Sequence, residues 1–316
     1  MKADELSREQ RLYYEGEWRE GFYVESKMRC AWAAEIEVLL EIDRICKKHG
    51  ITWFADSGTL LGAVRHQGFI PWDDDIDIMM CRKDYRRFLQ VAEKELPSSW
   101  ILMHANDDKS QWEQPFARVT NGDSYSMKFE RLKQFHGCPY VVGVDIFPLD
   151  NIPTEPEEEE LLCLMIQMVF GVMCLIEEGG SAEEIEKNLQ EIEAVCRVTI
   201  DRNKKIQNQL FRVIDKLSSL YYDSECVEVG CLAWNLDKKN KRKWKKSCFE
   251  EFLEMPFEDI VVPVPVGYQE ILSTYYGKDY MTPVQKKGGH DYPFYKKQDE
   301  ELEQMKRQEE TESGNI

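Results

Sequence analysis

The chain has 316 residues, enough for one large domain or two modest ones with an ample core. It carries 59 acidic against 41 basic residues, a formal charge of −18 and a pI near 4.9. Such acidity argues against nucleic acid as a partner, because a phosphate backbone requires a positively charged surface. The ten cysteines occur without any Cys-x-x-Cys pair, so the sequence gives no support for a zinc site.

Residues 1–25 are polar and acidic, which is not typical of a secretory signal peptide. Together with the scattered cysteines, this favours a cytoplasmic protein with reduced thiols. The apolar run 161–176 is shorter than the roughly 20 residues of a membrane-spanning helix, and acidic clusters flank it. The run predicts a buried or subunit-contact helix, with peripheral membrane contact as the alternative.

In the first half of the chain, hydrophobic periodicity predicts alternating helices and short strands. Helices are expected over 28–48, 60–65 and 83–96, the first ending in Lys47, Lys48 and His49 before Gly50. Strands are expected over 51–55, 100–104 and 116–120, with a weaker one at 126–129. A strong strand over 141–147 is expected to end at Pro148.

Beyond residue 155 the composition changes to helical patterns over 157–178, 181–202, 203–222 and 247–254. Residues 257–266 hold several prolines and are expected to be extended. The chain therefore divides into an N-terminal lead-in, a core of helices and strands, a helical subdomain, a returning C-terminal part of the core and a charged tail. The corresponding ranges are 1–27, 28–153, 154–254, 255–295 and 296–316.

The acidic segment Pro71–Ile78, PWDDDIDI, carries the chemistry of the chain. If it is a strand, Ile76 and Ile78 point into a core while Asp75 and Asp77 share the opposite face, with Asp73 in line if the strand begins that early. Carboxylates so close together repel one another unless a divalent cation lies between them. Few, hard oxygen ligands suit magnesium that arrives with a phosphate substrate. Asp145 lies in a similar pattern on the strand 141–147.

Several blocks of the sequence resemble the LicD/fukutin family of phosphotransferases. They are SGTLLGAVRHQGFIPWDDDIDI (57–78), VDIFPLDNIP (144–153), VPVPVGYQEILSTYYGKDYMTP (262–283) and KKGGH (286–290). The resemblance covers roughly residues 30–290, and segment 155–250 carries no recognisable family block. It implies an α+β fold, with a nucleotidyltransferase-like mixed β-sheet flanked by helices and a mostly helical insertion.

The resemblance also implies the site. Asp75, Asp77 and Asp145 would be catalytic, and together with Asp73 they would hold Mg²⁺, or Mn²⁺ in its place. Asp145 is either a metal ligand or the base. Gly58 and Thr59 would hold phosphate at the start of a helix, although on local grounds a plain helix cap is nearly as good an interpretation. Arg65, Lys286, Lys287 and His290 would contact substrate; without the resemblance, the last three are a solvated basic turn.

The function implied is transfer of a phospho-alcohol such as phosphocholine from a CDP-activated donor to a sugar hydroxyl, with release of CMP. The acceptor would be a cell-surface glycan, such as lipopolysaccharide or teichoic acid, or its lipid-linked precursor, which would bring the protein to the inner face of the membrane. Two alternatives remain open. One is a nucleotidyltransferase that moves NMP to a small molecule, and the other is a nucleotide-binding scaffold without turnover.

Overall fold

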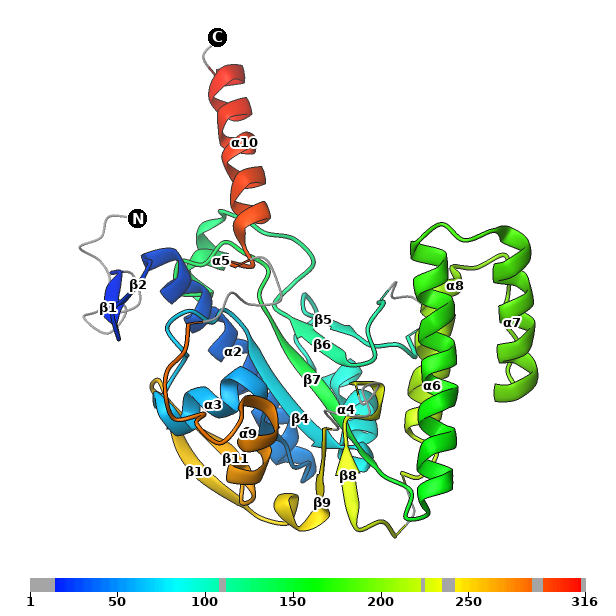
Figure 1. Cartoon of the computed structure of the whole chain (residues 1–316). Coiled ribbons are helices and arrows are strands. Elements are labelled where there is room, and N and C mark those ends of the chain that lie inside the picture. The colour runs from blue at the N-terminus through cyan, green and yellow to red at the C-terminus, as the bar shows by residue number, and fades with distance from the viewer. Residues whose placement is uncertain (1–14, 108–111, 223–224, 235–241, 286–291, 314–316) are drawn as a thin grey trace.

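A computed structural model describes residues 15–107, 112–222, 225–234, 242–285 and 292–313 (Figure 1). Its centre is a mixed sheet with helices packed around it, which confirms the predicted α+β class. The strands of the sheet, in spatial order, are β3 (Phe54–Ala55), β4 (Ile76–Cys81), β7 (Gly143–Asn151), β6 (Ala117–Thr120) and β5 (Ile101–Met103). β4 and β7 are parallel and the other neighbours are antiparallel.

Two helices, α2 (Ser26–His49) and α4 (Arg82–Glu95), pack against each other and against β7. α2 ends as the sequence predicts, with basic residues in its last turn and Gly50 in the left-handed conformation. α3 (Ser57–Arg65) packs against β4 and against α9 (Tyr268–Tyr276). It begins earlier than predicted, because Ser57, Gly58 and Thr59 form its first turn and not a separate turn before it.

β4 and β7 differ from their predictions at their ends. β4 starts only at Ile76, so Asp73 does not lie in line with Asp77 on the strand. The predicted alternation holds inside it, since Ile76, Ile78 and Met80 are fully buried. β7 does not end at Pro148, which pairs with Met80 inside the strand. Proline lacks a backbone N–H, so a strand tolerates it at a position where no neighbouring carbonyl would accept that hydrogen bond.

Residues 228–245 add two more strands to the sheet. β8 (Glu228–Gly230) extends β7 and pairs with β9 (Lys243–Lys245). The helix predicted over 247–254 is wrong, because a 3-10 turn (Lys246–Phe249) leads there into β10 (Phe252–Phe257). β10 forms a hairpin with β11 (Ile260–Pro265), which confirms the extended backbone predicted for this proline-containing segment.

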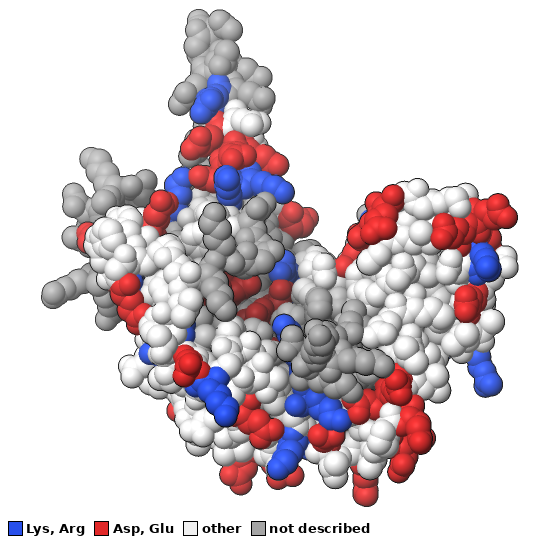
Figure 2. Space-filling view, in the orientation of Figure 1, with Lys and Arg blue, Asp and Glu red and all other residues white. Residues whose placement is uncertain are grey.

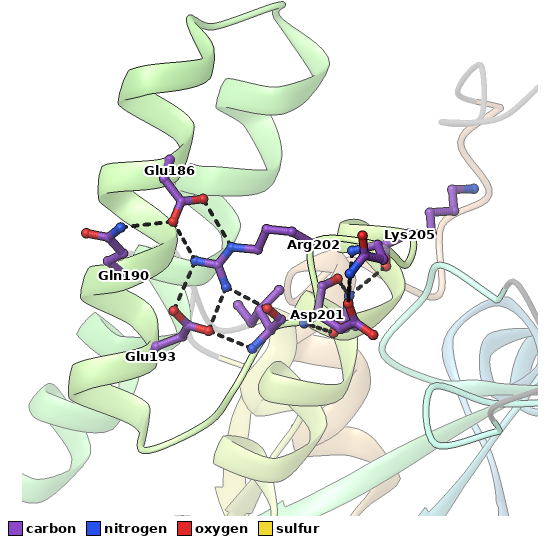
Figure 3. Close-up of polar contacts among 9 residues, drawn as sticks. Glu186, Gln190, Glu193, Asp201, Arg202 and Lys205 are labelled. Atoms are coloured by element: carbon purple, nitrogen blue, oxygen red, sulfur yellow. Dashed lines mark hydrogen bonds and ion pairs between the residues drawn. The ribbon is translucent and has the colours of Figure 1, made fainter.

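Three helices form an arm beside the sheet, on the right in Figure 1: α6 (Pro156–Glu177), α7 (Ala182–Cys196) and α8 (Ile206–Ser218). They share a second hydrophobic cluster that includes Ile166, Leu189 and Leu210. α7 and α8 are both shorter than predicted. Their connection is held by Arg202, whose guanidinium donates to Glu186 and Glu193 of α7 (Figure 3).

The sequence predicted a buried or subunit-contact helix over 161–176, and α6 buries one face and exposes another. Leu162 and Ile166 face the arm's own core, whereas Leu161 and Leu164 are exposed by 59% and 50%. The helix is long and apolar enough to cross a membrane, and 28% of its most apolar window is buried. Figure 2 shows this lobe as a largely uncharged surface with acidic side chains at its ends. A subunit contact through this face remains a prediction.

Three further features complete the described part of the chain. Residues 17–24 form a hairpin, β1 (Glu17–Arg19) and β2 (Phe22–Val24), where the sequence suggested a loose or helical lead-in. The weak strand expected at 126–129 is also wrong, because helix α5 (Phe129–Gln134) starts there. The charged tail is a helix, α10 (Lys296–Ser313), which projects from the molecule (Figure 1).

Candidate active site

The predicted aspartates converge at the start of β4 and β7. Because these strands are parallel, Asp77 and Asp145 occupy paired positions on neighbouring strands. Arg118 of β6 occupies the position paired with Asp145 on the other side. The Arg118 guanidinium binds both oxygens of Asp145, with Nη2 at 2.6 Å from Oδ2. The sequence predicted both aspartates. It did not predict Arg118, which only the register of β6 against β7 brings to Asp145.

The loop before β4 brings three more carboxylates together. One oxygen of each of Asp73, Asp74 and Asp75 lies within 4.8 Å of the others. Asp74 is fully buried and accepts a hydrogen bond of 2.6 Å from the Phe294 amide, so the segment before α10 closes on this loop. Asp74 was not a predicted ligand, whereas Asp73 and Asp75 were. The loop and the two strands thus place all four predicted metal ligands in one region.

The first turn of α3 lies directly against these carboxylates. A Cβ atom on Gly58 would stand 2.1 Å from Oδ2 of Asp73, so only glycine allows the helix to approach so closely. The Thr59 hydroxyl is buried and accepts a hydrogen bond of 2.9 Å from the Asp77 amide. Thr59 therefore fixes β4 against the helix, and contact of Gly58 or Thr59 with phosphate remains a prediction.

Burial and like charges dominate the electrostatics here. The pKa of Asp77 is raised well above its usual value, first by burial and then by the carboxylates of Asp75 and Asp145. Burial also raises the pKa of Asp145, and the Arg118 guanidinium opposes that shift. The pKa of Asp56, the residue before α3, is raised by burial to about 6. Such a group of carboxylates requires additional positive charge to stay ionised.

Glu35 of α2 is a site residue that the prediction missed. It is 2% exposed, its Oε2 has no hydrogen-bond partner among the described residues, and burial together with Asp75 raises its pKa. It lines a cavity of about 840 Å³ that is also lined by Asp75, Arg118 and Asp145. The sequence did carry a signal, because Glu35 lies seven residues from both Met28 and Ile42 on the buried stripe of the helix.

Two aromatic residues and an arginine approach Asp56 from the C-terminal part of the chain. The carboxylates of Asp56, Asp73 and Asp77 contribute, after burial, to raising the pKa of Tyr276. The Arg242 guanidinium lies over the ring of Tyr275 at 5.0 Å. Arg242 immediately precedes β9. Figure 2 shows acidic side chains in a hollow near the middle of this face, with basic ones beside it.

Arg65, another predicted contact, is not part of this cluster. Arg65 is at the opposite end of α3, about 10 Å along the helix from Gly58 at 1.5 Å per residue. Its guanidinium donates to the backbone carbonyls of Tyr280 and Thr282. Lys286, Lys287 and His290 lie outside the described residues.

Sequence comparison identifies the class of this site. Residues 50–159, which contain β3, α3, β4 and β7 with all the predicted aspartates, match the model of the LicD/FKTN/FKRP nucleotidyltransferase domain. Residues 50–159 therefore correspond to the nucleotidyltransferase domain of the LicD family, as the sequence motifs indicated.

Three relatives are similar to this chain. The lipopolysaccharide cholinephosphotransferase LicD of Haemophilus influenzae is 24% identical over 246 residues, which cover 78% of this chain and 88% of that protein. An uncharacterised protein of Rickettsia typhi is 44% identical over 68 residues, 22% of each chain. One of Rickettsia prowazekii is 42% identical over 55 residues, 17% of this chain and 21% of that protein.

Proposed function

We propose that this protein transfers a phospho-alcohol, such as phosphocholine, from a CDP-activated donor to a sugar hydroxyl of a cell-surface glycan or its lipid-linked precursor. The observation that carries the proposal is the carboxylate cluster of Asp73, Asp75, Asp77 and Asp145 inside the matched domain. The name of the Haemophilus relative supports both the group transferred and the kind of acceptor.

The donor set fits magnesium. All four proposed ligands are carboxylates, the hard oxygen donors that Mg²⁺ and Mn²⁺ prefer. The raised pKa of Asp77, caused by burial and neighbouring carboxylates, indicates a site that is short of positive charge. When bound there, the metal would neutralise the diphosphate and stabilise the CMP that leaves.

The chain's own residues would position the reaction. The first turn of α3 lies against the carboxylate of Asp73, and a helix N-terminus of this kind can receive phosphate oxygens. An acceptor hydroxyl would attack the phosphorus that bears the alcohol, and the bond from that phosphorus to the CMP oxygen would break. Asp145 would take the hydroxyl proton or serve as a ligand, with its orientation held by Arg118 in both cases.

The cavity beside the aspartates has the size of a ligand site, since small-molecule pockets are commonly about 300–1,000 Å³. It is lined by Glu35 and Arg118 as well as by apolar side chains such as Phe116 and Val142. We assign this space to one of the two substrates. The lipid-linked form of the acceptor would bring the protein to a membrane surface.

The main rival is a nucleotidyltransferase that moves NMP, in which the phosphorus next to the nucleoside is attacked. Release of CMP from a CDP-alcohol supports our proposal, whereas release of pyrophosphate from a nucleoside triphosphate supports the rival. A scaffold without turnover would bind the donor and release neither product.

A thermal-shift screen tests the proposal first. CDP-choline, CDP-ribitol, CDP-glycerol, CTP and ATP are each added with and without Mg²⁺, because a ligand of the native state raises the melting temperature. We expect a magnesium-dependent shift with one CDP-alcohol. Asp75→Asn should lose that shift, and Asp123→Asn, an exposed carboxylate away from the cluster, should keep it. A shift with CTP or ATP alone would favour the rival.

A further inference from the structure

Among the described residues, the wall of the cavity beside the aspartates carries more negative than positive charge. Its carboxyl groups belong to Glu35, Asp74, Asp75 and Asp145, and its guanidinium to Arg118. The Arg118 guanidinium binds both oxygens of Asp145, so the charges of that pair offset each other. Asp75 is one of the proposed magnesium ligands, and Asp74 accepts a hydrogen bond from a backbone amide. Glu35 is the carboxyl group that these contacts leave unexplained.

Glu35 lies on the buried stripe of α2 and lines the cavity from that helix. It is 2% exposed, and no basic side chain of the described residues forms an ion pair with it. A buried carboxylate without a countercharge costs free energy. Coulombic attraction in a poorly screened cavity extends over several ångströms, so Glu35 favours a cation there even where its oxygens do not touch the ligand.

Apolar side chains form much of the remaining wall. They are Met103, Phe116, Val141, Val142 and Phe294. Phe116 is held in place by Phe147, with ring centroids 4.6 Å apart. Aromatic rings attract cations, and methylated ammonium groups are bound by them in particular. An apolar wall with one unpaired carboxyl group therefore suits a cation whose own surface is apolar.

The polar side chains of the wall are largely engaged by other parts of the chain. Gln298 accepts from the Val141 amide at 2.8 Å and donates to the Val141 carbonyl at 3.2 Å. The Thr120 hydroxyl donates to the Gly122 carbonyl at 2.9 Å. A polyol such as ribitol or glycerol needs a hydrogen-bond partner for each hydroxyl that leaves water, and this wall offers few.

We propose that this cavity receives the alcohol end of the donor, and that Glu35 makes it select a methylated ammonium alcohol, the class of choline, over a polyol. This inference rests on the proposed function and specifies the donor. With the diphosphate at the aspartates, the alcohol lies beside Asp75 and Asp145, which both line the cavity. The ammonium charge offsets Glu35, and its methyl groups contact the apolar wall without any N–H that would need an acceptor.

Binding to the full-length protein tests this selection. The Kd values of CDP-choline, CDP-ethanolamine, CDP-glycerol and CMP are measured in Mg²⁺ by calorimetric titration. We expect CDP-choline to bind more tightly than CDP-glycerol by a factor of about ten or more, with CDP-ethanolamine between them. Equal affinity for CDP-choline and CDP-glycerol would overturn the inference. CDP-ethanolamine that binds as tightly as CDP-choline would overturn the role of the apolar wall.

A matched pair of variants tests Glu35 itself. Glu35→Gln keeps the size of the side chain and removes its charge. It should reduce the preference for CDP-choline over CDP-glycerol by about fivefold or more and leave the Kd of CMP within about twofold, which also shows that the variant is folded. Glu250→Gln removes the same charge from an exposed position outside the cavity and should leave the preference unchanged. An equal loss of affinity for CMP and for every CDP-alcohol would mean that Glu35 acts through the metal, and would overturn its role in selection.

The same titrations separate failure of this inference from failure of the proposed function. Magnesium-dependent binding of CDP-glycerol or CDP-ribitol, without a preference for CDP-choline, would uphold the phosphotransferase and overturn the selection by Glu35. If CTP or ATP binds and no CDP-alcohol does, both the proposed function and this inference are wrong.

Discussion

Asp77 and Asp145 lie side by side because β4 and β7 are parallel neighbours whose register pairs these two residues. They are 68 positions apart in the sequence, with β5, β6 and α4 between them. A parallel pair requires a long crossover, and here that crossover delivers Arg118 on β6 to the far side of Asp145. The juxtaposition of two carboxylates and one guanidinium is the basis of the first predictions.

Asp77→Asn should abolish turnover and leave the fold intact. The amide cannot supply the negative charge that the metal requires, so we expect a loss of at least about a hundredfold in CMP release. The melting temperature without metal should be equal or higher, because the substitution relieves repulsion from Asp75 and Asp145. Activity within a few-fold of the wild type would show that the metal site is placed wrongly.

Arg118→Gln should destabilise the protein in a way that magnesium partly corrects. Removal of the guanidinium leaves Asp145, which is 7% exposed, beside Asp77 without its countercharge. Because the Arg118 side chain is itself 39% exposed, the expected cost is about 1–3 kcal/mol and not the larger value of a fully buried pair. Added Mg²⁺ should raise the melting temperature more in the variant than in the wild type. An equal magnesium effect in both proteins would argue against the shared site.

Gly58→Ala should reduce activity without unfolding the protein. The new Cβ would meet Oδ2 of Asp73 at 2.1 Å and displace that carboxylate, while alanine itself favours a helix by about 1 kcal/mol. Gly171→Ala on α6 is the control, because no atom within 4 Å opposes its Cβ. We expect the control to retain full activity and to melt slightly higher. If both variants behave alike, the close approach at Gly58 has no functional role.

Asp56→Asn should stabilise the protein, and more so at higher pH. Burial raises the pKa of Asp56 to about 6 from an unfolded value near 4, so between these pH values the folded state binds the extra proton. Wild-type stability therefore falls as the pH rises through this window. The advantage of the variant should be larger at pH 7.5 than at pH 5 by roughly 1–2 kcal/mol, measured by urea unfolding. An advantage that does not change with pH would mean that the Asp56 carboxyl titrates normally.

Local sequence determined the elements that carry a strong periodic or capping signal. The limits of α2 and α4 and the burial of Ile76, Ile78 and Met80 follow from spacing alone, since the core-facing side chains of one element repeat at a fixed period. The same signals failed where a neighbouring strand decided the outcome. Pro148 continues β7 because β4 pairs with it, and residues 252–257 form a strand because β11 lies opposite.

For the site, the sequence by itself determined that Asp73, Asp75 and Asp77 form one acidic group, since they are close along the chain. The fold decided what surrounds them. Arg118 and Glu35 reach the aspartates through strand register and helix packing, contacts between residues far apart in sequence that no local pattern specifies.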